Sequence, residues 1–225
     1  YIQNINGIRL DPAGGDFTSI CQELHLIQAD VVGFTEHNLS TEKHHIKDQL
    51  QNTLRNHWEA SKLTTSSSAI DFDYSYKPGG TMMATLGDVT AKVRETGADS
   101  MGRWSYIKMA GKDNSIITIV TAYQVVENKI SQAGPRTAYA QQWATQRQTE
   151  SSPNPRKRFC KDLLQLLKQW KTQGEHIILA GDFNESLGSD SSGMSNMTSE
   201  LTLIDVMALK HGLAQELPPS ALAPK

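Results

Sequence analysis

Several features are scarce in this sequence, and each absence excludes a class of protein. Only two cysteines occur, Cys21 and Cys160, which are too few for a disulfide framework. No apolar run approaches the roughly 18 residues of a membrane-spanning helix. Residues 1–9 lack the basic and then apolar pattern of a signal peptide, and no repeat of fixed period is present. We therefore expect an intracellular globular protein without a membrane partner.

Net charge is also small, at −2, but it is unevenly distributed. Between Arg103 and Lys171 there are 12 basic residues and four acidic ones, so this middle third carries an excess of eight positive charges. Such asymmetry suits a protein with one surface facing a polyanion and acidic groups elsewhere. The alternative is that these lysines and arginines lie on ordinary solvated helix faces.

Apolar strands alternate with amphipathic helices along the chain, and this pattern predicts an α+β fold with helices flanking stacked sheets. A hairpin is expected where two alternating segments flank a polar turn at 111–114. Residues 62–76, rich in Ser and Thr, are predicted as a surface loop that could hold a short strand, and residues 188–198, rich in Ser, Gly and Met, are predicted as a loop. The expected strands are 3–10, 31–35, 81–86, 103–110, 115–126 and 177–180, and the expected helices are 16–27, 42–58, 138–145, 156–172 and 201–210.

The stretch His176–Asn184 is the most informative. Its apolar run, 177–180, reads as a buried strand that ends in Gly181, Asp182, Phe183 and Asn184. Side chains two residues apart on a strand share a face, so Asp182 and Asn184 are predicted to point at one place. A carboxylate and an amide there suit a divalent metal and a phosphate oxygen. The alternative is an ordinary strand end, where Gly, Asp and Asn are favoured turn residues.

Polar groups close other predicted strands in the same way, and their order resembles the endonuclease/exonuclease/phosphatase superfamily of metal-dependent phosphodiesterases. Its apurinic endonucleases and the endonuclease domains of non-LTR retrotransposons are the most similar branches. The resemblance implies one domain over 1–225, folded as a four-layer sandwich of two packed, mostly antiparallel sheets between helices. The matching segments are Gln3–Arg9, Val32–Glu36, Gly79–Thr81, Thr121–Tyr123 and Ala180–Asn184.

A Mg²⁺ site follows from the resemblance, with Mn²⁺ as the alternative metal. Glu36 would be its main ligand, with Asn4 and Asn6 beside it. Mg²⁺ keeps several waters and needs few protein ligands, so one glutamate with neighbouring amides is enough. Relatives often carry an aspartate at the position of Asn6, and the amide here removes one negative charge.

The other catalytic roles also come from the resemblance. Tyr123 would hydrogen-bond the scissile phosphate or assist the nucleophile. Asp182 would orient or deprotonate the attacking water, and Asn184 would hold a phosphate oxygen in the transition state. Together with Glu36, these residues form the predicted catalytic set.

Substrate contacts are predicted at positively charged and amide side chains near these strand ends. Phosphate contacts dominate the affinity of proteins for DNA, so the basic segment at the start of the third long helix is a natural candidate. DNA is the expected partner, with RNA as the alternative. The predicted substrate-binding residues are Arg9, Asn38, Arg156, Lys157 and Arg158.

One departure from the family concerns the end of the sequence. Relatives continue with strands that carry an aspartate and then an Asp-His pair, whereas neither His176 nor His211 stands in that place. We therefore expect a C-terminally incomplete domain whose last strands are missing and whose natural chain continues past Lys225.

Three functions remain open at this stage. The leading one is a DNA endonuclease that nicks at abasic sites or at retrotransposon target sites, working in the nucleus and fused to a reverse transcriptase in the second case. The same fold could instead cleave inositol phosphates, lipids or RNA. The third alternative is a catalytically degenerate domain that only binds nucleic acid.

Overall fold

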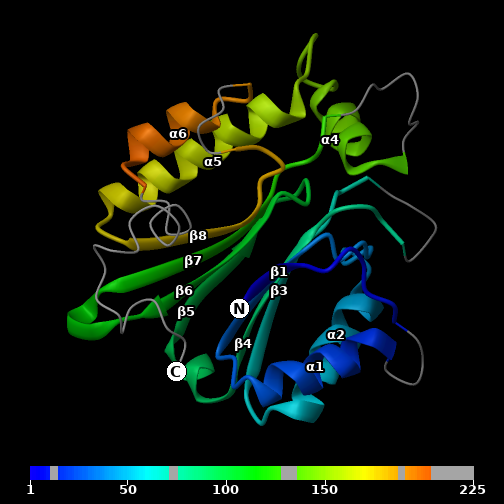
Figure 1. Ribbon diagram of the computed structural model, residues 1–225, viewed down its shortest axis with the longest axis vertical. Coiled ribbons are helices and arrows are strands. Elements are labelled where there is room, and N and C mark those ends of the chain that lie inside the picture. The colour runs from blue at the N-terminus through cyan, green and yellow to red at the C-terminus, as the bar shows by residue number, and fades with distance from the viewer. Residues whose placement is uncertain (11–14, 71–75, 128–135, 187–190, 204–225) are drawn as a thin grey trace.

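The computed structural model describes residues 1–10, 15–70, 76–127, 136–186 and 191–203. Two four-stranded sheets pack face to face, and helices cover the outer face of each. Figure 1 shows the four layers, with α1 and α2 on one side and α5 and α6 on the other. The predicted α+β sandwich is confirmed.

The first sheet has the strand order β1-β2-β4-β3. β1 runs parallel to β2, and the other neighbours are antiparallel. Its helices pack a continuous apolar core onto it, which includes Phe17, Leu50 and Met82. The elements are β1 (Ile2–Asn4), α1 (Gly15–Leu26), β2 (Val31–Thr35), α2 (His44–His57), β3 (Ser61–Ser66) and β4 (Thr81–Leu86).

The second sheet has the order β5-β6-β7-β8, and here β7 and β8 form the parallel pair. Its own core lies under α5 and α6 and includes Phe159, Leu163 and Trp170. The chain passes between the sheets through the 3-10 turn η1 (Gly87–Lys92). The remaining elements are β5 (Val93–Ala98), β6 (Trp104–Ala110), η2 (Lys112–Asn114), β7 (Ile116–Tyr123), α4 (Ala138–Gln146), α5 (Pro155–Thr172), β8 (His176–Asp182) and α6 (Met194–Leu201).

The contact between the sheets is less apolar than either outer core. Met83, Ile107 and Met109 form a small buried cluster there. Nearer the strand ends the facing residues are polar, and the hydroxyls of Thr81 and Ser105 lie 2.8 Å apart in a buried hydrogen bond. The sheets therefore dock through a short apolar patch and a polar layer.

Most predicted elements are confirmed, with four corrections; β3 is the short strand allowed for within the predicted loop 62–76. β1 ends at Asn4 instead of continuing to residue 10, and β5 was not anticipated. α6 occupies part of the predicted loop 188–198 and ends at Leu201, while residues 204–210 of the predicted last helix lie outside the described residues. β8 is not a buried strand, because it pairs with β7 alone within the described part of the chain and leaves Ile178 52% exposed.

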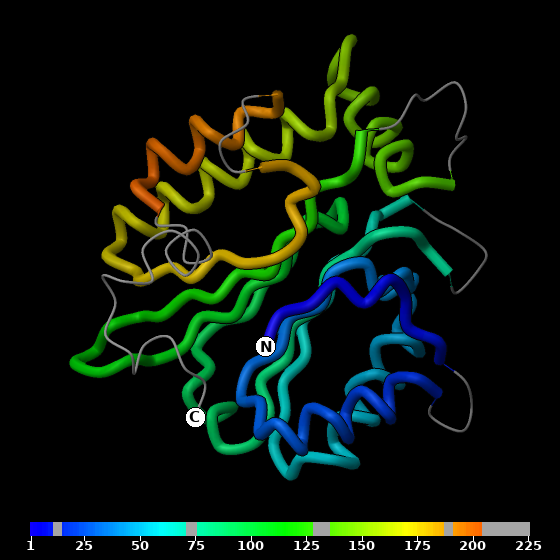
Figure 2. The backbone as a smooth tube through the Cα atoms, viewed as in Figure 1, coloured from blue at the N-terminus to red at the C-terminus, as the bar shows by residue number. Residues whose placement is uncertain are grey.

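The topology gathers four strand ends at one edge of the sandwich. Asn4 at the end of β1 pairs with Thr35 at the end of β2, and Tyr123 at the end of β7 pairs with Asp182 at the end of β8. Figure 2 shows α5, which precedes β8, lying side by side with α6, which follows it. None of the described helices is long and apolar enough to cross a membrane.

Candidate active site

Glu36 directly follows β2 and has an unusual backbone. Its φ is 54°, in the left-handed region that residues with a side chain seldom adopt. Both neighbours of β2 hold it there, because Glu36 N donates to Gly80 O at 2.8 Å and Gly7 N donates to Glu36 O at 2.6 Å. Strained residues of this kind persist only where the surroundings over-determine them. The fold thus holds Glu36 in an unfavourable backbone conformation that places its carboxylate at the edge of the sandwich.

The turn at Gly79–Gly80 packs beside Glu36 and accepts a hydrogen bond from its backbone amide. Gly80 has φ +88°, and a Cβ on it would lie 2.5 Å from the ring of His37. His37 is fully buried; Leu39 N donates to its Nδ1 at 3.0 Å, so Nε2 carries the proton and donates to Ser66 O at 3.0 Å. Burial lowers the pKa of His37 to about 4, which keeps the imidazole neutral. The histidine is therefore a structural support and no metal ligand.

Asn4 joins the two sheets at the site. Its Nδ2 donates to Glu36 Oε1 at 2.9 Å and to Asp182 Oδ2 at 2.7 Å. The carboxylate from the first sheet and the carboxylate from the second therefore converge on one amide. Three predicted site residues that are far apart in the sequence meet here.

Tyr123 lies beside the same carboxylates. It is 6% exposed and its hydroxyl hydrogen-bonds Glu36. Burial raises the pKa of Tyr123 above its usual range, and the negative charges of Glu36 and Asp182 raise it further. The phenol stays protonated at neutral pH, so it can donate a hydrogen bond but cannot serve as a phenolate base.

Asn4 with Asn6 and Asp182 with Asn184 each form a turn, which corrects the prediction that Asp182 and Asn184 share a strand face. Asn6 N donates to Asn4 Oδ1 at 3.0 Å, and Asn184 N donates to Asp182 Oδ1 at 3.1 Å. Asn6 and Asn184 have φ values of 46° and 47°, outside the strands. These are the self-bonding turns that Asn and Asp favour. Each turn fixes the first residue of its pair through the backbone of the second.

The side chain of Asn184 also lies at the site, where its Nδ2 donates to Gln124 O at 2.8 Å. Asn6 approaches Asn4 only through its backbone amide among the contacts found for the described residues.

Two predicted substrate-binding residues have other partners. Asn38 is 7% exposed, and its Oδ1 accepts from Gly79 N at 2.7 Å. Asn38 supports the glycine turn through this contact. Arg9 is 90% exposed and forms a surface ion pair with Asp16 at 3.2 Å. Such pairs are weak, so Arg9 is still able to meet a phosphate.

The basic segment at the start of α5 divides into three different environments. Arg156 is 8% exposed, and its guanidinium is held by protein groups, which leaves it less free to meet a substrate than its neighbours. Arg158 is half-buried and pairs with Asp162 at 2.7 Å and with Glu150. Lys157 is exposed and takes part in no ion pair within the described ranges, so it alone of the three is free for a phosphate.

The donor set fits a hard divalent cation. Glu36 and Asp182 form no ion pair with any described residue, which leaves two negative charges focused on one neutral amide. No group of three or more His, Cys, Asp or Glu side chains with metal-site geometry occurs among the described residues. Mg²⁺ needs few direct ligands and accepts carboxylate oxygens, so Glu36 would hold the ion, with Asp182 and the Asn4 amide beside it.

Sequence reasoning missed the groups that hold the catalytic residues in place. Glu185 is one, a carboxylate whose side chain is 4% exposed and which pairs with Arg156 at 2.8 Å. Its position directly after Asn184 was the available signal, because an acid beside a catalytic turn needs a cation partner once it is buried.

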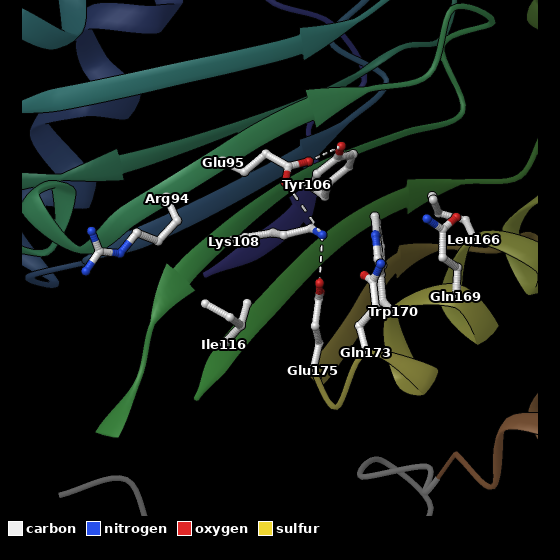
Figure 3. Close-up of a pocket in the computed structure, with 10 residues that line it drawn as sticks. All are labelled: Arg94, Glu95, Tyr106, Lys108, Ile116, Leu166, Gln169, Trp170, Gln173 and Glu175. Carbon is white, nitrogen blue, oxygen red and sulfur yellow. Dashed lines mark hydrogen bonds and ion pairs between the residues drawn. The ribbon is translucent and has the colours of Figure 1, made fainter. Parts of the chain in front are cut away.

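A cavity of about 540 Å³ lies at the opposite end of the second sheet and is separate from this site. Figure 3 shows it between α5 and β5, over β6. Lys108 forms its floor, bonded to Glu175 at 2.7 Å and lying 4.9 Å from the Trp170 ring centre. Glu175 directly precedes β8, whereas Asp182 ends it, so this groove is remote from the converging carboxylates.

Comparison with known proteins agrees with this geometry. A sequence model of the Endonuclease/Exonuclease/phosphatase family matches residues 3–219. No curated protein matches the chain in sequence. Among solved structures, the human Nocturnin catalytic domain with bound sulfate anion is 16% identical with a TM-score of 0.60, and the match covers 97% of this chain and 75% of that one.

Two further structures show the same fold. The AP endonuclease from Archaeoglobus fulgidus is 15% identical with a TM-score of 0.55, over 93% of this chain and 73% of that one. The AP endonuclease LMAP from Leishmania major is 17% identical with a TM-score of 0.53, over 80% of this chain and 53% of that one. At these identities the likeness concerns the fold alone.

Proposed function

Because the chain belongs to the Endonuclease/Exonuclease/phosphatase family, we propose that it is a Mg²⁺-dependent phosphodiesterase that nicks DNA. One observation carries this proposal: Asn4 Nδ2 lies 2.9 Å from the Glu36 carboxylate and 2.7 Å from that of Asp182. Two unpaired carboxylates at the ends of strands from different sheets form a site for a cation and a phosphate diester.

Glu36 would hold the metal, with Asn4 and Asp182 beside it. Bound Mg²⁺, or Mn²⁺ in its place, would supply positive charge that neutralises the phosphate oxygens and the leaving oxygen. The left-handed backbone of Glu36 and its two backbone hydrogen bonds fix the carboxylate before substrate arrives. Fixed charges of this kind need no reorganisation during the reaction.

Asp182 would accept the proton of the attacking water. The new bond joins the water oxygen to phosphorus, the bond from phosphorus to the leaving oxygen breaks, and the proton moves to the carboxylate. Asp182 is held for this task on both oxygens, by Asn184 N at 3.1 Å and by Asn4 Nδ2 at 2.7 Å. Positioned general bases contribute about 10²- to 10⁴-fold to such reactions.

Tyr123 and Asn184 would contact the phosphate. The Tyr123 hydroxyl remains a donor because burial and the adjacent carboxylates keep it protonated. Asn184 contributes an amide whose donor already bonds Gln124 O at 2.8 Å, so the side chain is held at the strand end. Both groups can stabilise negative charge that grows on the phosphate.

DNA is preferred as substrate because of exposed cations near the site, of which Lys157 at the start of α5 is the clearest. AP endonucleases are among the proteins of similar fold, but so are Nocturnin and a mannosyl-6-phosphatase of Bacteroides thetaiotaomicron (TM-score 0.50, 14% identity, 88% of this chain and 69% of that one). We retain the target-site nuclease of a retrotransposon, working in the nucleus beside a reverse transcriptase, as one form of the proposal. RNA, lipid and inositol phosphodiesters are the alternative substrates.

Nicking of supercoiled plasmid tests the proposal. The protein with Mg²⁺ should convert supercoiled to open-circular DNA, EDTA should abolish the reaction, and Glu36→Gln and Asp182→Asn should each lower the rate at least about 10²-fold. Glu59→Gln, an exposed glutamate after α2, is the matched control and should act as wild type.

The same proteins are then assayed on an abasic-site duplex, an RNA oligonucleotide and soluble phosphodiesters. If the protein cleaved only the RNA oligonucleotide or only a soluble phosphodiester in the presence of metal, that compound and not DNA would be the substrate. If the wild-type protein cleaved none of these substrates, the proposal that it is an enzyme would be refuted, and the alternative of a domain that binds without cleaving would stand.

A further inference from the structure

We propose that Arg156 is a positioning residue that fixes the catalytic end of β8. This inference rests on the proposed function. Arg156 is the second residue of α5, after the Asn154 cap and Pro155, and it is 8% exposed. It reaches inward from the helix start toward the ends of β7 and β8, where Tyr123 and Asp182 lie.

Its guanidinium joins the start of α5 to the segments that follow β7 and β8. Nη1 donates to Val125 O at 2.6 Å, just after β7, and Nη2 donates to Asn184 O at 3.2 Å, just after β8. Nη2 also meets Glu185 Oε2 at 2.8 Å. A guanidinium is planar with its donors at fixed angles, so these contacts set the separation of the two strand ends.

Glu185 completes the arrangement from the other side. Its carboxylate accepts from Ser191 Oγ at 2.7 Å and from Ser192 N at 3.2 Å, at the entrance to α6. A buried ion pair is stable only where further hydrogen bonds satisfy both partners. Both partners are satisfied here, so the arrangement is a rigid part of the fold.

The contact to Asn184 connects Arg156 to the reacting groups. Asn184 has φ 47°, and its backbone amide donates to Asp182 Oδ1 at 3.1 Å. If its carbonyl lost the guanidinium, that residue would be free to leave the left-handed region and withdraw the amide from Asp182. Glu36 and Asn4 are held by the first sheet and would keep their places.

Arg156→Gln and Arg156→Lys test the inference, with Lys108→Gln as the matched control. Lys108 also loses a buried ion pair, to Glu175 at 2.7 Å, but at the start of β8 instead of its end (Figure 3). Lysine at 156 keeps the charge beside Glu185 but cannot bond three acceptors with a fixed fork. It therefore serves as the better-folded variant of the pair.

For Mg²⁺-dependent cleavage at temperatures where every variant is folded, we expect kcat to fall by about 10²-fold in both Arg156 variants, the effect of a small misplacement of a reacting group. KM and the Mg²⁺ affinity from calorimetry should stay within about threefold of wild type, because the metal ligand Glu36 is undisturbed. Lys108→Gln should retain wild-type kcat.

Hydrogen exchange of the Asn184 amide gives a readout that does not depend on activity. It should be at least about tenfold faster in the Arg156 variants and unchanged in Lys108→Gln. If the wild-type protein cleaves nothing, the proposed function fails while this comparison still decides the role of Arg156. Equal exchange in all variants, an equal loss of kcat in Lys108→Gln, or a rise in KM alone would each overturn the inference.

Discussion

At the scale of single residues, His37 links the stability of the fold to pH. Its pKa is lowered to about 4 in the native protein by burial, which the carbonyl of Ser66 and the charge of Glu42 only partly offset. The unfolded chain therefore binds a proton between about pH 6.5 and pH 4 that the native protein does not. Stability is greatest above this window and is lost as the pH falls through it.

We predict that His37 accounts for about 3 kcal/mol of the stability lost on acidification, the free-energy equivalent of this pKa difference. Urea unfolding of wild type and His37→Gln at pH 7.5 and pH 4.5 measures it. Glutamine can still donate toward Ser66 but cannot titrate. The wild-type loss should therefore exceed that of the variant by about 2 to 3 kcal/mol, and equal losses would contradict the prediction.

The sequence predicted which residues meet at the site better than it predicted how they meet. Glu36, Asn4, Tyr123 and Asp182 converge as expected, because strand ends at one edge of a sandwich must lie together. The prediction that Asn184 shares a strand face with Asp182 was wrong, because it extended the two-residue repeat of a strand past the end of β8 at Asp182. Left-handed residues that bond their own backbone leave no apolar pattern, so periodicity could not reveal them.

At the scale of elements, the pairing of β7 with β8 depends on one glycine. Gly181 has φ +148°, and a Cβ on it would lie 1.9 Å from Ala122 O. No backbone of a residue with a side chain can come so close. β8 can thus carry Asp182 to its place beside Tyr123 only with glycine at this position.

Gly181→Ala should destabilise the protein by more than about 4 kcal/mol, since backbone strain and a clash with a strand add together. Gly174→Ala is the control: φ is +79° there, but no atom lies within 4 Å of the added methyl group. That variant should lose only about 1 kcal/mol, the cost of the left-handed backbone alone. Chemical denaturation of both variants measures the difference, and similar losses would refute the steric argument.

The long helices and the central hairpin were predictable because their patterns are strong, with five apolar residues on one face of α5 as the example. β5 and α6 were missed for physical reasons. β5 reads Val-Arg-Glu-Thr-Gly-Ala, an exposed edge strand without apolar alternation. α6 begins after a left-handed glycine, with Met194 and Met197 buried against α5 in a segment that composition marks as a loop.

At the scale of the whole molecule, ion pairs consume much of the positive charge that marked the middle third of the chain. Among the described residues of this third, five basic side chains are paired with acids, so they cannot contribute fully to a field around the protein. They are Arg103, Lys108, Arg156, Arg158 and Lys168. Fewer positive charges are therefore available to bind a polyanion than the number of basic residues in this third suggests.

We predict that DNA affinity depends on the remaining exposed cations near the site. Lys157→Gln should weaken binding equally for all DNA sequences and reduce the salt dependence, d log K/d log[salt], by about 1. Lys47→Gln, an exposed residue on α2 of the other sheet, should change neither. Fluorescence anisotropy over a range of salt concentrations measures both, with Ca²⁺ replacing Mg²⁺ to suppress cleavage. Identical values of d log K/d log[salt] for the two variants would show that the DNA does not contact Lys157.

The order of the chain through the two sheets has one more consequence. Every strand of the first sheet precedes the turn η1, and every strand of the second follows it. Glu36 and Asn4 therefore belong to one contiguous half of the polypeptide, and Tyr123 and Asp182 to the other. A cut within Gly87–Lys92 would yield two fragments, each with an incomplete reaction centre, and catalysis would itself report their complementation.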